Sequence, residues 1–380
     1  MVLYKKGGAF LKILIVCNSS IGLEKFRGML IQSLIKRKNS IVTIVPLLDD
    51  PEEKNAQKKL MALDCTVIRV PIKRRGINPL TDAKLFSKYY RFIKREKPDL
   101  VLTYTIKPNI YGGIACRILK VPYAVNITGL GTAFQGNSIL KHVITMMYKV
   151  ALKKVKIVFF ENVENRNIFV DFGIVSKEKT HVLAGAGVDL EHFSYMDYPT
   201  DTDNTRFLFV GRVMQEKGID ELFCVMRRLY KNGYKCSLDI LGGFEENYSE
   251  KIQQYEAEGW LHYRGFQNDI RPFVKNTHCL VLPSWHEGMA NTNLECAAMG
   301  RPIITSNIHG CLEAVDDGIS GFLCGKKDRE SLYLKMKEFI EMPFGDKEVM
   351  GIVGRKRMES LFDKKVVVEA TINELMKGRM

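Results

Sequence analysis

The sequence predicts an α/β protein built from two doubly wound parallel sheets. The chain has 380 residues, more than one ordinary hydrophobic core requires. Short Val/Ile/Leu runs alternate with segments of helical spacing in both halves, a pattern typical of parallel strands buried on both faces. Charge also divides the chain, because residues 1–200 hold 32 Lys/Arg against 16 Asp/Glu and residues 201–380 hold 25 against 27. Such a split indicates two domains with different partners.

The expected elements follow from these runs. In the first half we expect strands at 12–16, 41–45, 66–70, 100–104, 123–127, 157–161 and 180–184, and helices at 81–97, 138–156 and 163–172. In the second half we expect strands at 207–211, 237–242, 261–265, 279–283 and 302–306, and helices at 218–232, 292–299 and 328–341.

The polar, turn-rich stretch 193–205 marks the joint between the halves. We therefore expect an N-terminal domain at 1–195, a C-terminal domain at 200–360, and a final helix at 361–380 that packs back on the first domain. Residues 1–10 are interpreted either as a non-native leader before initiation at Leu11 or as a disordered leader.

Composition predicts a cytoplasmic protein. No run of about 18 apolar residues is present, so no spanning helix is expected. The N-terminal stretch lacks the apolar segment and cleavage site of a signal peptide. The nine cysteines contain no C-x-x-C pair, which favours reduced, mostly buried thiols over disulfides or a structural zinc site.

Candidate ligand-binding residues follow the predicted strands of the second half. Ligands of doubly wound sheets bind outside the carboxyl ends of the strands. After the strand 207–211, Gly211 allows close approach, and Arg212 and Lys217 could hold phosphate oxygens; a solvated loop with an ion pair is the alternative. Gly242 forms a second glycine turn, and Phe266 could flank a flat base.

Two glutamates stand out in the stretch "SWHEGMANTNLECAAMGRP", Glu287 and Glu295, with seven residues between them. Thr292 and Glu295 have the spacing of a capping box, which is a structural alternative for Glu295. Glu287 has no comparable structural role. Backbone amides of this loop suit a diphosphate, and carboxylates beside it would bind hydroxyls. A polyol joined to a diphosphate describes a nucleotide sugar.

Arg212, Lys217, the E-x7-E pair and "GRPIITSNIHGCLEAVDDGISGFL" together resemble the retaining glycosyltransferases of family 4. The resemblance implies the GT-B fold, in which two Rossmann-like domains face each other across a cleft. It implies that Glu295 holds the ribose, that Glu287 contacts the donor sugar, and that Arg212 and Lys217 stabilise the diphosphate leaving group. It also implies no metal and no cofactor. The remaining donor-binding positions are Gly288, Met289, Ala290, Asn291 and Thr292.

In the first half, the resemblance places Gly22 in a loop near the donor phosphate and acceptor. Phe26-Arg27 resembles a pattern of bacterial surface-polysaccharide transferases, so we expect Arg27 to contact the acceptor. Lys107 and Asn109 could meet an anionic acceptor or donor. A solvated lysine and a helix cap are the alternatives for these last two. Thr128 stands where many relatives have histidine, so only a sugar contact is expected there.

The expected function is transfer of a sugar, with retention, from a UDP-hexose or UDP-N-acetylhexosamine to a lipid-linked saccharide of a bacterial surface polysaccharide. The basic helical segments 84–97 and 139–156 are either solvated faces or contacts with an anionic membrane, which would make the protein peripheral on the inner face of the cell membrane. A sugar-nucleotide epimerase of the same fold, a nucleic-acid-binding protein and an inactive scaffold are the alternatives.

Overall fold

The computed structural model describes residues 10–72, 78–131, 139–201 and 203–377, so nearly all of the expected leader lies outside the described residues. The chain forms two compact units: unit 1 is Met1–Ala186 with Lys365–Met380, and unit 2 is Gly187–Lys364. The boundary comes earlier than the polar joint expected at 193–205. The reason is that the buried Arg301 guanidinium donates to the carbonyls of Met196 (2.8 Å) and Asp197 (2.9 Å), which fixes this stretch to unit 2.

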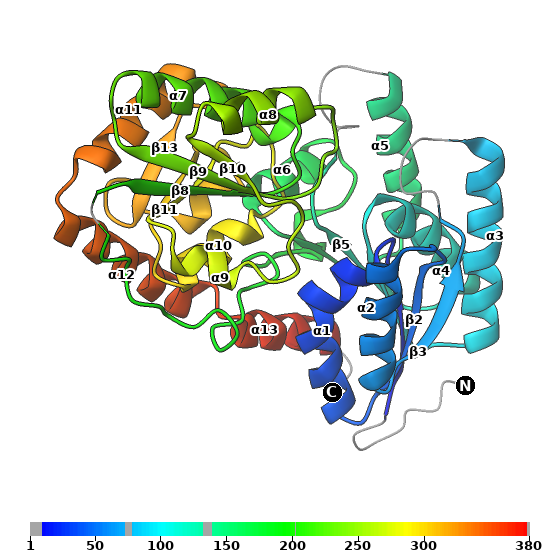
Figure 1. Cartoon of the computed structure of the whole chain (residues 1–380). Helices are drawn as coiled ribbons and strands as arrows, with labels where there is room; N and C mark the ends of the chain where they lie inside the picture. Colours follow the sequence, from blue (N-terminus) through cyan, green and yellow to red (C-terminus); the bar gives the residue numbers. More distant parts are fainter. Residues whose placement is uncertain (1–9, 73–77, 132–138, 202, 378–380) are drawn as a thin grey trace. The chain divides into compact units, whose positions relative to one another are not determined.

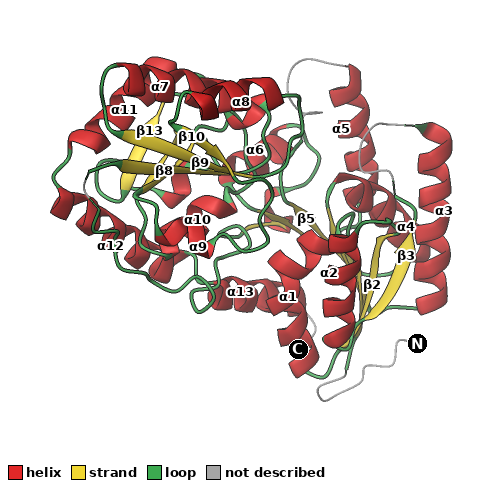
Figure 2. Ribbon diagram, in the orientation of Figure 1, coloured by secondary structure: helices red, strands yellow, loops and turns green. Residues whose placement is uncertain are grey.

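Unit 1 is a parallel sheet with helices on both faces (Figures 1 and 2). Its strands are β1 (Lys12–Val16), β2 (Ser40–Pro46), β3 (Thr66–Val70), β4 (Leu100–Tyr104), β5 (Tyr123–Ile127), β6 (Ile157–Phe160) and β7 (Thr180–Val182). Their order in the sheet is β3-β2-β1-β4-β5-β6-β7. Its helices are α1 (Ser20–Lys36), α2 (Pro51–Ala62), α3 (Pro79–Glu96), η1 (Pro108–Gly112), α4 (Gly113–Leu119), α5 (Ile139–Leu152), α6 (Val163–Asp171), η3 (Lys177–Lys179) and α13 (Lys364–Met376).

Unit 2 has the same construction. Its strands are β8 (Thr205–Val210), β9 (Cys236–Leu241), β10 (Leu261–Tyr263), β11 (Cys279–Leu282), β12 (Ile303–Ser306) and β13 (Gly321–Cys324). They pair in parallel in the order β10-β9-β8-β11-β12-β13. Its helices are η4 (Gln215–Lys217), α7 (Ile219–Lys231), α8 (Ser249–Ala257), α9 (Arg271–Lys275), α10 (Asn291–Ala298), η5 (Leu312–Ala314), α11 (Arg329–Glu341) and α12 (Phe344–Leu361).

Several elements were not among those expected from the sequence, including helices α1, α2, α4, α8, α9 and α12 and strand β13. Residues 20–36, expected to begin as a loop, form helix α1, because Ser19 caps it by accepting from the Gly22 amide at 3.0 Å. Strand β13 was not expected at all. It pairs with β12 where Gly321 packs so closely on the Ile303 backbone that a Cβ would overlap the Ile303 carbonyl oxygen.

Hydrophobic side chains fill both faces of each sheet. In unit 1, alternate residues of β1 point into different clusters, Leu14 and Val16 into one and Ile13 and Ile15 into the other. Helix α13 buries Val367, Val368, Ile372 and Leu375 in the second of these clusters. Among the described residues, no helix is both long and apolar enough to cross a membrane.

Candidate active site

The candidate residues of unit 2 lie at the carboxyl edge of its sheet, between β8 and β11. From β8 the strands that follow in the sequence, β9 and β10, are added toward one edge of the sheet. From β11 the following strands, β12 and β13, are added toward the other edge. Such a switch point leaves a crevice in a doubly wound sheet. The loop after β8 carries Arg212 and Lys217, and the loop after β11 carries Glu287, so the topology brings the predicted charges to one edge.

Lys217 and Glu287 form an ion pair between these two loops. Both side chains are largely buried, with exposed fractions of 18% for Lys217 and 11% for Glu287. The Ser284 hydroxyl donates to the same Glu287 oxygen, Oε1, at 2.7 Å. Glu287 therefore holds a fixed orientation set by a cation from one strand end and a hydroxyl from its own loop.

Glycines let the loops approach each other this closely. Gly218, just after Lys217, has φ = 72°, and a Cβ there would overlap the carbonyl oxygen of Pro283 in the Glu287 loop. On the other side, a Cβ at Gly310 would lie 2.7 Å from the Glu287 carbonyl oxygen. Backbone hydrogen bonds join the same loops, from the Trp285 amide to Glu216 O (2.9 Å) and from the Ala290 amide to Gly310 O (2.7 Å).

Arg212 lies at the same edge but in a different environment. Its guanidinium is half exposed (54%) and pairs with Glu245 of the loop after β9, with 3.1 Å between Nη1 and Oε2. The structure therefore pairs Lys217 with Glu287 and Arg212 with Glu245. Gly211 and Gly242 have a packing role here, since a Cβ at Gly242, where φ is 148°, would overlap the Gly211 carbonyl oxygen.

Glu295 is not part of a capping box, so that alternative is wrong. Helix α10 starts at Asn291, and its N-cap position is Ala290, which has no capping side chain. Thr292 is already the second helical residue, and Glu295 lies in the second turn, only 5% exposed. The Glu295 carboxylate is buried near the positive end of the helix dipole. It does not cap the helix.

Two backbone amides of the 288–292 segment already donate hydrogen bonds within the protein. The Ala290 amide donates to Gly310 O, and the Asn291 amide donates to Met289 O at 3.0 Å. Met289 and Ala290 are buried, whereas Gly288, Asn291 and Thr292 are half-buried. The positions expected to contact a diphosphate through backbone amides therefore lie at the edge, but two of these amides already have carbonyl partners.

Aromatic side chains gather after β9 and β10. Phe266 is 60% exposed, as a base-contacting residue requires. Phe244 and Tyr263 stack with ring centroids 4.7 Å apart, and the Tyr263 hydroxyl donates to Gly242 O at 2.9 Å. Sequence reasoning missed Phe244, Tyr263, Ser284 and Glu245. Phe244 directly follows the "LGG" turn, which was the available signal.

The candidate residues of unit 1 are more enclosed than the sequence suggested. Arg27 is 8% exposed and pairs with Glu161 at 2.7 Å, and its guanidinium stacks over the Tyr104 ring. Burial raises the pKa of the Glu161 carboxyl, against the opposing effect of Arg27. Arg27 is thus held by partners within unit 1, and its contact with an acceptor stays a prediction.

Lys107 and Asn109 also have partners within unit 1. The Lys107 ammonium lies 2.8 Å from Asp82 of α3, and the Asn109 amide donates to Asn126 O at 2.8 Å. Neither the solvated lysine nor the helix cap is therefore correct, since Asn109 is 1% exposed inside η1. Gly22 lies in the first turn of α1 and not in a loop.

Thr128 is half-buried directly after β5. Thr105, directly after β4, has φ = 73°, which is unusual for a β-branched residue. Strain of this kind often marks functional edges of a fold. Sequence reasoning passed over Thr105, because backbone dihedral angles leave no sequence signal in a residue other than glycine.

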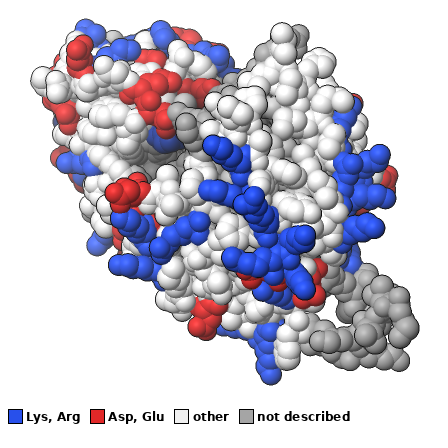
Figure 3. Space-filling model, turned by 90° about the vertical axis from the view of Figure 1, so that its right-hand side faces the viewer, with Lys and Arg blue, Asp and Glu red and all other residues white. Residues whose placement is uncertain are grey.

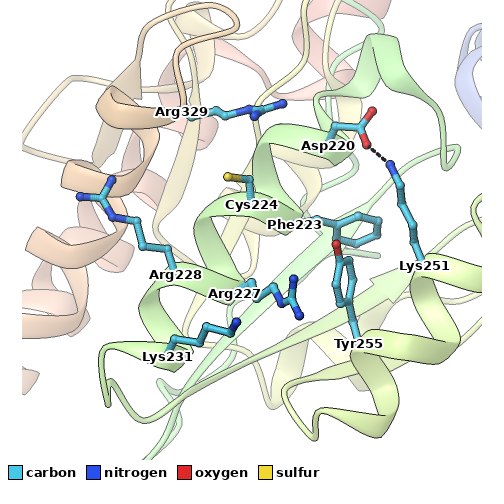
Figure 4. Close-up of a pocket in the computed structure, with 9 residues that line it drawn as sticks. All are labelled: Asp220, Phe223, Cys224, Arg227, Arg228, Lys231, Lys251, Tyr255 and Arg329. Atoms are coloured by element: carbon cyan, nitrogen blue, oxygen red, sulfur yellow. Dashed lines mark hydrogen bonds and ion pairs between the residues drawn. The ribbon is translucent and has the colours of Figure 1, made fainter.

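A separate hollow of about 310 Å³ lies on the outer side of unit 2 between α7, α8 and α11 (Figure 4). It is rich in cations, but Arg227 pairs with Glu258, Arg228 with Glu330, and Lys251 with Asp220. None of the residues at the β8/β11 edge discussed above lines it. Among the described residues, no group of three or more His, Cys, Asp or Glu side chains is arranged to hold a metal.

Comparison with known proteins identifies the family. Residues 196–357 match the profile described as "Glycosyl transferases group 1", and residues 29–162 match "Glycosyl transferase 4-like". An Escherichia coli relative, UDP-Gal:alpha-D-GlcNAc-diphosphoundecaprenol alpha-1,3-galactosyltransferase, is 30% identical over 69% of this chain and 71% of its own. The chain belongs to glycosyltransferase family 4.

Two further relatives align with nearly the whole transferase. The Campylobacter jejuni N,N'-diacetylbacillosaminyl-diphospho-undecaprenol alpha-1,3-N-acetylgalactosaminyltransferase is 26% identical over 87% of this chain and 90% of its own. The Staphylococcus aureus capsular polysaccharide biosynthesis glycosyltransferase CapM is 25% identical over 96% and 98%. All of these are transferases, which favours transfer over the epimerase alternative.

Solved structures confirm the fold of the transferase. Anabaena Alr3699/HepE in complex with UDP and glucose superposes with a TM-score of 0.78 at 17% identity, covering 96% of this chain and 99% of that one. The lipopolysaccharide outer core galactosyltransferase WaaB gives a TM-score of 0.71 at 16% identity over 96% and 99%. The two Rossmann-like units are thus those of the GT-B fold.

Proposed function

We propose that this transferase moves a hexose or N-acetylhexosamine, with retention of configuration, from a UDP-sugar to a lipid-linked saccharide in bacterial surface-polysaccharide synthesis. The observation that carries the proposal is the Lys217–Glu287 ion pair at the β8/β11 switch point of unit 2. Two of the similar proteins are named for acceptors on undecaprenol diphosphate, and a third for capsule synthesis. These names support the acceptor class.

The geometry supports a division of labour around the donor. The Lys217 ammonium is the cation for the diphosphate, and Arg212 is a second one, since a guanidinium binds two phosphate oxygens at once. Glu287, once Lys217 turns to the diphosphate, accepts from a hydroxyl of the donor sugar. Glu295 binds the ribose, and the aromatic surface of Phe244, Tyr263 and Phe266 lies beside the base.

The chemical step needs no strong protein base in this scheme. The acceptor hydroxyl attacks on the face that the diphosphate leaves, and a leaving phosphate oxygen takes the hydroxyl proton. The two cations stabilise the charge that develops on the diphosphate, so we propose that the reaction is metal-independent. Positioning of donor and acceptor supplies most of the remaining rate.

We also propose that the transferase works as a peripheral protein on the cytoplasmic side of the cell membrane. Lys and Arg exceed Asp and Glu twofold in residues 1–200. On the side where Figure 1 shows α3 and α5, Lys and Arg side chains gather across the middle of the surface (Figure 3). Such a surface suits anionic lipid head groups and a diphosphate-linked acceptor.

The test is nucleotide release from a panel of UDP-, GDP- and ADP-sugars, with and without polyprenyl-diphosphate saccharides extracted from bacterial membranes. We expect release from one UDP-sugar, and only with the extract. The configuration at the new linkage, read by NMR, should match that of the donor, and chelation of divalent metals should leave the rate unchanged. Failure of every nucleotide to bind would overturn the assignment of the unit 2 site.

A further inference from the structure

Helix α5 of unit 1 exposes a continuous apolar surface. Five of its large apolar side chains are exposed: Ile139 (86%), Leu140 (41%), Val143 (44%), Met146 (58%) and Val150 (43%). At about 100° per residue, Ile139, Val143, Met146 and Val150 fall within about 60° of one another around the helix. They form one stripe along its length, which we call the α5 stripe.

The opposite side of α5 is apolar as well. Ile144, Tyr148, Ala151 and Leu152 are buried in the core of unit 1. A helix with apolar residues on both sides is usually buried on both sides, by the protein core or by another apolar phase. An apolar surface of this kind, bordered by polar residues, marks a contact with a partner or a membrane.

The border of the α5 stripe is basic. His142, Lys149, Lys153 and Lys154 are exposed next to it, and residues 139–156 contain no Asp or Glu. The Lys141 ammonium lies 5.0 Å from the ring centroid of Phe172, which is 42% exposed and adds an aromatic side chain to the surface. In Figure 3 the upper right of the face is largely uncharged, whereas charged side chains cover the upper left.

Helix α3, the other basic helix of the sequence, is different. Its apolar residues Leu85, Tyr89 and Ile93 are buried. Apart from Pro79, Leu80 and Ala83 near its start, its exposed face is polar, with Lys84, Arg91, Lys94 and Arg95. A solvated face explains α3, but it does not explain α5. The structure therefore separates two helices that look equivalent in sequence.

We propose that α5 lies in the interfacial layer of an anionic bilayer, with the α5 stripe inserted among the acyl chains and the lysines on lipid phosphates. An apolar face with a basic border is the composition of helices that lie in the membrane plane. The proposal rests on the proposed function, because a lipid-linked acceptor must be reached at a bilayer surface. The proposed function gives unit 1 an anionic membrane surface as its partner. The inference adds that α5 inserts into that membrane.

The test is co-sedimentation of the whole chain with vesicles of phosphatidylcholine alone or with about one-third phosphatidylglycerol. The variant V143S/M146S should lower the partition coefficient by about tenfold or more, because two apolar side chains no longer gain burial. The variant K153Q/K154Q should lower it about fivefold or more on anionic vesicles at low salt, and little at high salt.

Matched controls separate insertion from general stickiness. L334S/V349S removes two apolar side chains of unit 2 that have similar exposure, at 53% and 57%, and should leave binding unchanged. K94Q/R95Q removes two charges from α3 and should weaken binding less than K153Q/K154Q does. Thermal melts of all variants identify any that fail to fold.

Three results would overturn the proposal. One is unchanged vesicle binding by V143S/M146S, and another is an equal loss in L334S/V349S. The third is conversion of a dimer to a monomer by V143S/M146S without a change in vesicle binding, which would assign the stripe to a second copy of the chain. Sugar transfer to a detergent-dissolved acceptor tests the proposed function separately. If the enzyme transfers sugar and V143S/M146S binds vesicles as well as the parent does, only the insertion of α5 is refuted.

Discussion

At the scale of single residues, the Lys217–Glu287 pair shows how the site gains its charges. Each side chain is more than four-fifths buried, and each neutralises the other. Removing one partner of such a pair leaves an uncompensated charge in a poorly solvated place. In the proposed function, the pair opens toward a ligand that offers an anion for Lys217 and a hydroxyl for Glu287. A nucleotide sugar offers both.

Replacement of Glu287 by alanine should lower kcat by about 100-fold or more, because the donor sugar would no longer be held for attack. Steady-state kinetics with the donor found in the panel measures this. Glu245→Ala removes the carboxylate that pairs with Arg212 at the same edge and should change kcat much less. A kcat for Glu287→Ala within about threefold of the parent enzyme would contradict the assigned role.

Glu295→Ala should raise the donor KM with little change in kcat, since ribose contacts are equal in the ground and transition states. The structure removes capping as a competing explanation, because Ala290 is the N-cap position of α10. Kinetics and a thermal melt on the same sample are needed, because Glu295 is buried. A fall in stability with an unchanged KM would show that the carboxylate acts only in the fold.

At the scale of elements, the glycine turns decide whether the strand ends can approach each other. Gly242 and Gly243 are adjacent, but only Gly242 has positive φ and lies against the Gly211 carbonyl. Apart from its two chain neighbours, no described residue has an atom within 4 Å of a Cβ built at Gly243. These two glycines therefore have the same chemistry and different steric environments.

Gly242→Ala should lower the free energy of unfolding of unit 2 by about 2 kcal/mol or more, because the backbone of two loops must shift. Gly243→Ala should stay within about 1 kcal/mol of the parent. Both tryptophans, Trp260 and Trp285, lie in unit 2, so urea unfolding followed by tryptophan fluorescence reports on this unit. Equal losses in the two variants would show that close approach at Gly242 does not matter.

His278, just before β11, links the stability of unit 2 to pH. Burial lowers its pKa from 6.5 to about 4. The imidazole is held neutral, with Nδ1 accepting from the Arg206 amide (3.0 Å) and Nε2 lying 2.8 Å from Asp201 O. The pKa of His278 is lower in the folded than in the unfolded state. Its contribution to the stability of unit 2 is therefore complete above about pH 6.5 and is lost as the pH falls toward 4.

Unit 2 should therefore lose up to about 3 kcal/mol from this group between pH 6.5 and 4. His278→Asn should flatten that part of the pH profile, even if it lowers stability at every pH. The exposed His262 is the control, and His262→Gln should keep the slope of the parent. Urea midpoints at pH 7, 6, 5 and 4 measure the three profiles. An unchanged slope in His278→Asn would assign the pH dependence to other groups.

At the scale of the whole molecule, the two units carry different charges and different candidate roles. The basic unit 1 carries the α5 stripe and its lysines, while unit 2 carries the Lys217–Glu287 pair at its switch point. We expect nucleotide to protect unit 2 selectively. With UDP at about 100 times its Kd, amide exchange should slow at 211–218 and 284–292 by as much as about 100-fold, which corresponds to about 2.7 kcal/mol.

Hydrogen exchange of the intact chain, followed by mass spectrometry, gives both units in one experiment. Peptides from 100–128 of unit 1 are the internal control, because the proposed base, ribose and diphosphate contacts are all in unit 2. Protection confined to the unit 1 peptides would show that the nucleotide binds elsewhere.

The sequence by itself determined the alternation of strands and helices, because the period of apolar residues reports burial directly. It also determined the charged residues of unit 2, since Arg212, Lys217, Glu287 and Glu295 have a recognisable spacing. Local signals fail where tertiary contacts set the outcome. The capping-box spacing at Thr292 was such a case, because the Ala290–Gly310 hydrogen bond helps fix the start of α10.

Only the tertiary structure decided which charges meet. Arg27 and Glu161 are 134 residues apart, and the pair forms because α1 and the end of β6 come together on one sheet. Likewise, α3 and α5 share a basic composition, and only their packing shows that α5 turns apolar side chains outward. Pairing and exposure depend on which surfaces the sheet brings together, and spacing along the chain does not contain that information.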